Sequence, residues 1–156
     1  MENDRYIEEL NSFLVDVFNG ILKTEELYVT ANCPDLSLRE IHLIEEVCRA
    51  VDQGRDNRAS AMAAALRVTA GTLTAAVNQL EGKGYLERAR DGSDKRSVRL
   101  LPTQKGRKAM CHHRQFHQEL VAAVVDRLSP EEAEVLLRSL GGIASFFQER
   151  CQGQNA

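Results

Sequence analysis

The order of patterns between residues 59 and 101 constrains the fold more than any other feature of this sequence. The Ala-rich residues 59–66 favour a short helix packed closely on its neighbours. After a brief turn, Thr69 can cap a second helix that ends near Gly82 or Gly84. Two short strand patterns follow, joined by the turn signal Asp91-Gly92-Ser93-Asp94. This order predicts a helix-turn-helix followed by a two-stranded hairpin, the wing.

Amphipathic helices are expected before this centre. Apolar residues recur every three or four positions from Tyr6 to about Val29, which is the period of a helix with one apolar face. A break follows, and then Ser37 with Glu40 fits a capping box that opens a second helix. The second helix extends through Cys48.

Two further helices are expected after the hairpin. Thr103 can cap a long helix that runs from Gln104 to about Leu128. Ser129 and Pro130 then combine an N-cap with proline at the first helical position. Both this last helix and the first one carry apolar stripes longer than a small domain needs to cover itself.

The expected fold class is therefore mainly α with a small β-hairpin wing. Residues 37–102 would form the winged helix-turn-helix lobe, and residues 1–33 with 103–151 would form a helical lobe. The chain of 156 residues is 43% hydrophobic, enough for a core, and has no run of about 20 apolar residues that could span a bilayer. We expect a cytoplasmic protein without a membrane partner.

Positive charge is concentrated in one segment. The net charge of the chain is −3, but residues 67–108 hold ten basic and four acidic residues. Residues 1–46 hold three basic and eleven acidic residues. Such asymmetry is typical of an element that contacts nucleic acid, and double-stranded DNA is the partner that a helix-turn-helix implies.

The outer face of the second helix of this motif has the side chains that a helix in the major groove needs. They are small or able to hydrogen-bond, which permits close approach and contact with phosphates and base edges. The expected DNA-binding residues of this face are Thr69, Ala70, Gly71, Thr72, Thr74, Ala75 and Asn78.

The hairpin adds a cationic tip. Arg88, Arg90, Lys95 and Arg96 are expected to contact DNA, because arginine at a hairpin tip can enter a narrow minor groove. Asp94 stands two residues before Arg96, within reach of its guanidinium group, and is expected to orient it.

These residues carry a resemblance to a known family. Leu80-Glu81-Gly82-Lys83-Gly84-Tyr85-Leu86 followed by Arg88 resembles the helix end and strand start of the MarR regulators. Residues 94–103, with Asp-x-Arg and a later Leu-Pro-Thr, resemble the wing of that family, apart from the inserted Pro102. The resemblance implies a sequence-specific transcriptional regulator, usually a repressor, and not an enzyme. It also implies a homodimer, formed by the terminal helices, on a palindromic operator.

The histidines suggest a metal site. His113 and His117 are four residues apart on one helix, so both imidazoles lie on the same face and could chelate a metal ion. His42 belongs to the second helix, and Glu25 and Glu26 lie late in the first. Imidazole and carboxylate are ligands that zinc accepts.

This set resembles the zinc-responsive AdcR type of the MarR family. The resemblance implies Glu26, His42, His113 and His117 as zinc ligands, with Glu25 as the alternative to Glu26 because the match needs a one-residue gap. It also implies zinc as a co-repressor that promotes operator binding. A second metal site is implied near Cys33, rebuilt with Glu40 or His112.

Two alternatives keep the predicted fold but assign the regulator an effector other than zinc. The chain holds Cys33, Cys48, Cys111 and Cys151, which are expected to be reduced in the cytoplasm. Oxidation of Cys33 or Cys111 could be sensed, as in the MarR proteins that respond to peroxide. A small aromatic ligand in the cleft between the lobes is the other alternative.

Two readings of another class are less favoured by the residues. A zinc hydrolase of the HExxH type needs Glu after the first histidine, and Arg114 follows His113 here. A non-catalytic helical dimerisation protein is the remaining alternative, and the absence of salt-dependent DNA binding in a gel-shift experiment would distinguish it from a regulator.

Overall fold

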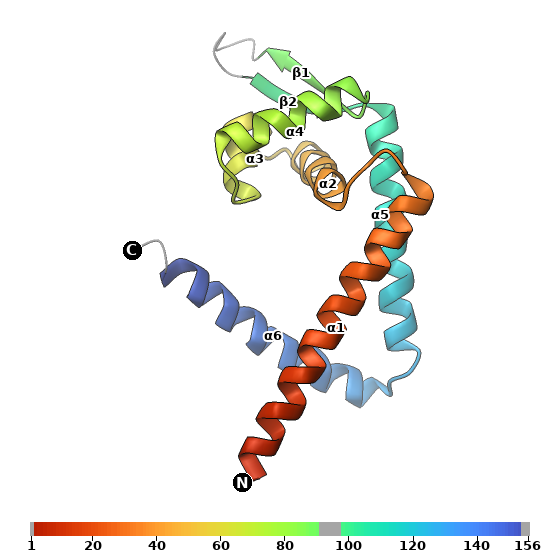
Figure 1. The fold of residues 1–156 in the computed structure, drawn as a ribbon, viewed down its shortest axis with the longest axis vertical. Coiled ribbons are helices and arrows are strands. Elements are labelled where there is room, and N and C mark those ends of the chain that lie inside the picture. Colours follow the sequence, from red (N-terminus) through yellow and green to blue (C-terminus); the bar gives the residue numbers. More distant parts are fainter. Residues whose placement is uncertain (1, 91–97, 154–156) are drawn as a thin grey trace. The chain divides into compact units, whose positions relative to one another are not determined.

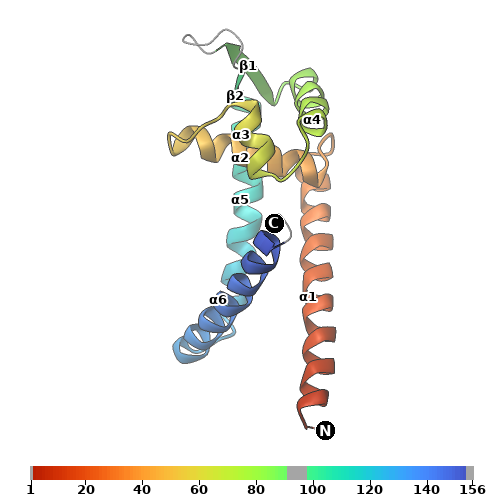
Figure 2. The same cartoon turned by 90° about the vertical axis from the view of Figure 1, so that its left-hand side faces the viewer.

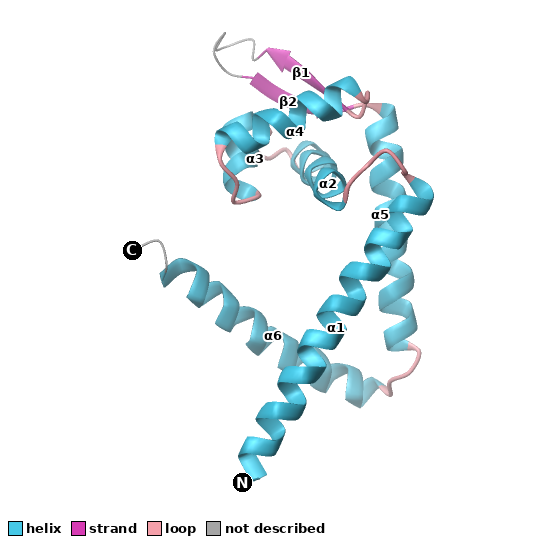
Figure 3. Cartoon of the chain, viewed as in Figure 1, coloured by secondary structure: helices cyan, strands magenta, loops and turns pink. Residues whose placement is uncertain are grey.

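The chain is mostly helical and carries one antiparallel hairpin (Figure 1 and Figure 3). The structure is a computed structural model and describes residues 2–90 and 98–153, with the side chains of residues 5–90 and 98–150. In order, the elements are α1 (Glu2–Asn32), α2 (Leu38–Asp52), α3 (Ala59–Ala65), α4 (Ala70–Gly82), β1 (Leu86–Arg90), β2 (Val98–Pro102), α5 (Gln104–Val125) and α6 (Pro130–Gly153).

Local capping determines where several helices begin. The Ser37 hydroxyl accepts from the backbone N–H of Glu40 at 3.3 Å, and the Glu40 carboxylate accepts from the Ser37 N–H at 2.8 Å. This capping box opens α2 as expected. Thr69 caps α4 through the Thr72 N–H at 3.1 Å, and Thr103 caps α5 through the Gly106 N–H at 3.1 Å.

The α5 helix ends earlier than the sequence indicates. It stops at Val125 rather than near Leu128. The N–H groups of Arg127 and Leu128 bond to carbonyl groups three residues back, at 3.1 and 3.0 Å, so the chain tightens into turns before the Ser129 cap of α6.

The helix-turn-helix and the hairpin share a continuous apolar core. In both views α2, α3 and α4 lie next to the hairpin (Figure 1 and Figure 2). The chain bends by 111° between α3 and α4, the angle expected of a helix-turn-helix. The hairpin pairs Leu86 with Pro102 and Arg90 with Val98. The most deeply buried apolar side chains of this core are Ile41, Ile44, Val47, Met62, Val77, Leu80, Leu86 and Leu100.

Gly106 permits the first turn of α5 to pass close to the end of α4. A Cβ atom at this position would lie 2.2 Å from the backbone oxygen of Tyr85 and 3.7 Å from Cγ2 of Ile44. Ile44 would be in ordinary contact, but the Tyr85 oxygen belongs to the backbone and cannot move aside cheaply. Glycine at position 106 is therefore required by close approach.

Replacing Gly106 with alanine is expected to lower the free energy of unfolding by about 1–3 kcal/mol through overpacking. Gly82→Ala is the matched control, because nothing lies within 4 Å of a Cβ atom at the end of α4 and alanine favours a helix. Guanidinium unfolding monitored by circular dichroism measures both variants. Equal stability of Gly106→Ala and wild type would contradict this account.

The chain divides into two compact units, one ending at Phe116 and the other beginning at His117. The predicted lobes 37–102 and 1–33 with 103–151 stay predictions. Within the first unit, α1 leaves many apolar side chains exposed, and within the second, α6 does the same. No single helix of the described ranges is long and apolar enough to cross a membrane; α3 and α4 pass that test only as a bent pair.

Candidate nucleic-acid interface and metal centre

The α4 helix separates an apolar face from a polar one. Leu73, Val77 and Leu80 are buried against the core at 3%, 1% and 0% exposure. The other face is open to solvent, and the structure places all the predicted recognition residues of the helix on it. These exposed residues are Thr69, Ala70, Gly71, Thr72, Thr74, Ala75 and Asn78.

The hydroxyl groups on this face are held in place by local hydrogen bonds. The Thr69 and Thr72 hydroxyls lie 2.8 Å apart, and Thr74 donates its hydroxyl proton to the Ala70 carbonyl at 2.8 Å. The fold itself does not require Gly71, because a Cβ atom there would meet only the Thr69 hydroxyl at 4.0 Å. A glycine in open space leaves room for another molecule to approach the start of α4.

The hairpin contributes two described cations of the predicted set. Arg90 is exposed. Arg88 is bonded to α4: its guanidinium group contacts the Glu81 carboxylate and donates to Oδ1 of Asn78 at 2.8 Å. The predicted DNA-binding residues Asp94, Lys95 and Arg96 lie outside the described residues.

A second group of polar side chains centres on Glu25 of α1. This side chain is only 3% exposed. Its Oε1 atom lies 2.6 Å from Nε2 of His113 on α5 and 3.0 Å from Nε2 of His42 on α2. One buried carboxylate thus joins three helices of the first unit.

His113 is held from both sides. Its Nδ1 atom lies 3.0 Å from Oε2 of Glu45, so each ring nitrogen faces a carboxylate oxygen. The hydrogen bond to His113 lowers the pKa of Glu45 to about 2. Burial alone would lower the pKa of His113, but hydrogen bonds to Glu45 and Glu25 raise it above its usual value. Without a metal ion, the arrangement favours an imidazolium between two carboxylates.

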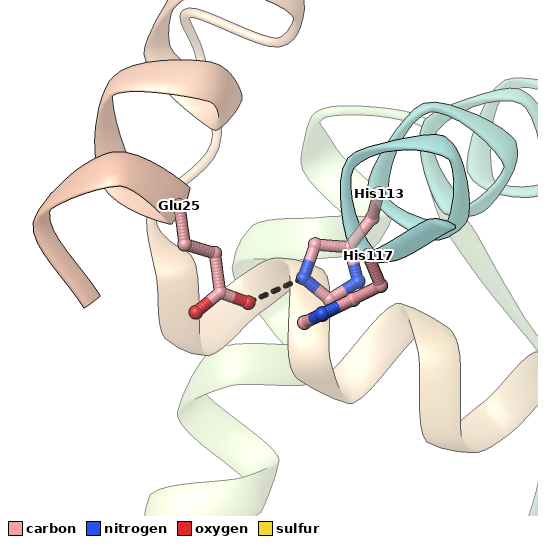
Figure 4. Close-up of side chains that lie close together, drawn as sticks. All are labelled: Glu25, His113 and His117. Carbon is pink, nitrogen blue, oxygen red and sulfur yellow. Dashed lines mark hydrogen bonds and ion pairs between the residues drawn. The ribbon is translucent and has the colours of Figure 1, made fainter. Parts of the chain in front are cut away.

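The side chains of Glu25, His113 and His117 offer ligand atoms that all lie within 4.8 Å of one another (Figure 4). His117 is the most exposed of the three. The boundary between the units falls directly before His117, so its place is set by the α5 helix that it shares with His113. One carboxylate oxygen and two imidazole nitrogens are a donor set that suits zinc.

Burial favours Glu25 over the predicted ligand Glu26. Glu26 is exposed, one position further along α1, and is not part of the cluster. A step of one residue turns a helix by about 100°, so only one of the two carboxylates can face α2 and α5. The predicted ligand His42 lies at the edge of the cluster, with its ring centroid 5.3 Å from that of His113.

The structure does not bring the predicted second metal site together. The described residues hold one group of three or more potential ligands, and Cys33, Glu40 and His112 are not in it. The Glu40 carboxylate already caps α2 and accepts from Nζ of Lys83 at 2.7 Å. Cys33 is buried.

Known proteins share both the sequence and the fold of this chain. The MarR family model matches residues 50–98. YwhA and YkoM of Bacillus subtilis (strain 168), both named as uncharacterized HTH-type transcriptional regulators, are 32% identical over 71 residues and 34% identical over 79. These matches cover 46% and 49% of this chain and 51% of each relative, so the chain spans about half the length of the curated relatives it matches.

Solved structures extend the similarity over nearly the whole chain. FabT of Streptococcus pneumoniae, crystallised in complex with DNA, is 34% identical with a TM-score of 0.85, over 92% of this chain and 98% of that one. The chain belongs to the MarR family. The MepR–DNA complex of S. aureus, at 20% identity and a TM-score of 0.67, covers 87% of this chain and 95% of that one and shares the fold.

Membership of the MarR family confirms the predicted fold and class. The structure has the expected winged helix-turn-helix, and the relatives are transcriptional regulators rather than enzymes, as predicted. The sequence analysis did not single out Glu45, the carboxylate that contacts Nδ1 of His113. Its signal was present: Glu45 follows His42 by three residues on α2, which places both on one side of that helix.

The thiols of this MarR protein differ in exposure. Cys111 is exposed, whereas Cys48 and Cys33 are buried. Burial raises the pKa of Cys48 to about 11, and burial with the nearby Asp35 charge raises the pKa of Cys33. Since the thiolate is the reactive form, both buried thiols are poor sites for oxidation.

We therefore expect Cys111 to react quickly with a disulfide reagent at pH 8, in a Cys151→Ser background. Cys48 should stay protected, because a pKa of about 11 leaves roughly one thiolate in a thousand at that pH. Labelling followed by mass spectrometry assigns each thiol, and guanidinium should expose the buried ones. Fast labelling of Cys33 in the folded protein would contradict this expectation and would support Cys33 as an oxidation sensor.

Proposed function

We propose that this chain is a sequence-specific DNA-binding transcriptional regulator that uses α4 in the major groove. The observation that carries the proposal is the exposed face of α4, where short threonine side chains, Gly71 and Asn78 replace the long charged residues of an ordinary surface helix. The 34%-identical FabT, crystallised in complex with DNA, supports the same use of the fold. Arg90 and the wing residues Lys95 and Arg96 would add contacts to phosphates or to the minor groove.

The regulator would act as a homodimer on a palindromic operator in the cytoplasm. Large apolar side chains of α1 and α6 are exposed, among them Phe13 at 63%, Leu137 at 71% and Phe147 at 59%. Extended apolar surfaces of this kind favour association, and a second copy of the chain is the simplest partner. A two-fold dimer would present two α4 helices about 34 Å apart, one turn of DNA.

Zinc would act as the co-repressor. Glu25, His113 and His117 supply a carboxylate and two imidazoles, and Glu45 would orient His113 through Nδ1 so that Nε2 faces the ion. Bound zinc would supply a positive charge that links α1 to α5. His42, which contacts Glu25, also lines a cavity beside Thr72 and Ala76 of α4.

The contact between Glu25 and His42 connects the proposed zinc site with the proposed DNA-binding helix. A shift of the Glu25 carboxylate on zinc binding would move His42 and, through α2, would displace the α4 helix that is proposed to contact DNA. Fixing one arrangement of these elements would select the DNA-binding state of the dimer, which is allostery by population shift. Repression then follows if the operator overlaps a promoter.

The test is selection of duplexes from a random pool by the full-length protein, once with zinc and once with a chelator. We expect an enriched inverted repeat, stronger binding with zinc, and an affinity that falls steeply with salt. Pools without an enriched sequence would refute the DNA-binding proposal. Weaker binding with zinc would refute only the co-repressor role.

A small amphipathic ligand is a second candidate signal, because the described residues include a cavity of about 330 Å³ beside α4. Its walls include Leu43, Leu73 and Val68, with Arg39 and His42 as its basic side chains. This chemistry fits an aromatic carboxylate. Benzoate derivatives should then raise the melting temperature and change DNA affinity in the presence of chelator, and Leu73→Phe should abolish both effects by filling the cavity.

A further inference from the structure

We infer that Arg88 is a positioning residue, which turns the amide of Asn78 so that it donates hydrogen bonds to DNA. Asn78 would thereby select a base with acceptor atoms. This inference rests on the proposed function, since it concerns the α4 face that would enter the major groove. It assigns Arg88 a role other than the direct DNA contact predicted from the sequence.

The contacts of Arg88 are directed toward α4. Its backbone N–H donates to Oε1 of Glu81 at 3.0 Å, and its Nη1 atom bonds the other oxygen of the same carboxylate. Nη2 donates to Oδ1 of Asn78 at 2.8 Å. Asn78 and Glu81 are three residues apart on α4, so one guanidinium group on β1 can reach both.

This arrangement decides which half of the Asn78 amide faces outward. A guanidinium group has donors only, so the atom it contacts must be the amide oxygen. The Glu81 carboxylate contacts the guanidinium group with one oxygen and accepts from the Arg88 backbone N–H with the other, which fixes the position of Arg88. The amino group Nδ2 is the half of the amide that Arg88 cannot occupy, and Asn78 is exposed.

The orientation has a consequence for base recognition. Asparagine reads adenine by accepting from N6 and donating to N7, which needs both halves of the amide. With its oxygen turned toward Arg88, Asn78 meets a base with its amino group and therefore as a donor. Guanine offers two acceptors, O6 and N7, and thymine offers O4, whereas cytosine offers only a donor. Adenine offers N7 as an acceptor, but its N6 amino group would then face the amino group of Asn78, donor against donor. We therefore expect guanine or thymine opposite Asn78 in each half-site.

The test compares base preferences of full-length variants selected on random duplexes. Arg88→Met frees the amide oxygen and should shift one position per half-site toward adenine, by roughly tenfold. Asn78→Asp keeps an acceptor for Arg88 but removes both donors, and should shift the same position toward cytosine by a similar factor. Arg90→Met is the matched control: it also removes one exposed cation of β1 and should weaken binding without changing any preference.

The outcomes separate this inference from the proposed function. If the wild type enriches a sequence and Arg88→Met keeps the wild-type preference, the inference is wrong while the DNA-binding proposal survives. If the wild type enriches nothing, both fail. Melting temperatures show whether Arg88→Met folds; if it does not, Asn78→Asp decides, and an unchanged preference in that variant refutes the inference.

Discussion

Replacing Leu10 and Phe13 with lysine is expected to separate the proposed dimer and to abolish tight operator binding. Both side chains are largely exposed in the single chain, at 56% and 63%, and they lie three residues apart on the apolar side of α1. Burying such a side chain contributes about 1.5–3 kcal/mol, and the double substitution removes four of them from a homodimer, so the dimer dissociation constant should rise by more than about 10,000-fold. Sedimentation velocity measures this directly.

The effect on DNA should also be large. A monomer contacts one half-site, and losing the second contact costs about 100- to 10,000-fold in affinity. Two added lysines would by themselves strengthen nonspecific binding, so a loss cannot come from charge. Ser12→Lys with Asn19→Lys is the matched control, because these exposed polar residues lie on the other side of α1. A Leu10→Lys, Phe13→Lys protein that remains a dimer would refute this interface.

Replacing Glu25 with glutamine is expected to lower zinc affinity by about 100-fold or more, since it removes the charged ligand of the cluster. The carboxylate is 3% exposed and contacts both His113 and His42, so no water-exposed group can take its place without rearrangement. Competition with a chromophoric chelator gives the affinity. The stabilisation of the folded protein by zinc should fall in parallel, because binding to the native state raises stability by mass action.

Glu26→Gln is the sharpest control for this experiment. It makes the same chemical change one residue away, at an exposed position, and should leave zinc affinity unchanged. If zinc affinity falls in Glu26→Gln but not in Glu25→Gln, Glu26 is the ligand, as the family resemblance implies. Equal affinity in both variants and in His113→Ala, His117→Ala would remove zinc from this site.

The boundaries of most elements could be predicted because they depend on near neighbours. Ser37 with Glu40, Thr69 and Thr103 each satisfy the first N–H groups of a helix within three residues, and no distant contact is needed for this. The exposed face of α4 was equally predictable. Its apolar residues Leu73, Val77 and Leu80 recur at helical spacing, which leaves the small and polar residues on the opposite side.

The amino-acid sequence by itself therefore determined the helices, the hairpin, the polar face of α4 and the candidate metal ligands by type. Only the tertiary structure decided between Glu25 and Glu26, because that choice depends on how α1 is turned where Tyr28 packs on Phe116, with ring centroids 5.3 Å apart. It also assigned Arg88 to Asn78 and Glu45 to His113, 10 and 68 positions away in the chain. Helix rotation and packing decide which of several similar polar groups come into contact. The spacing of residues along the sequence carries little information about rotation or packing.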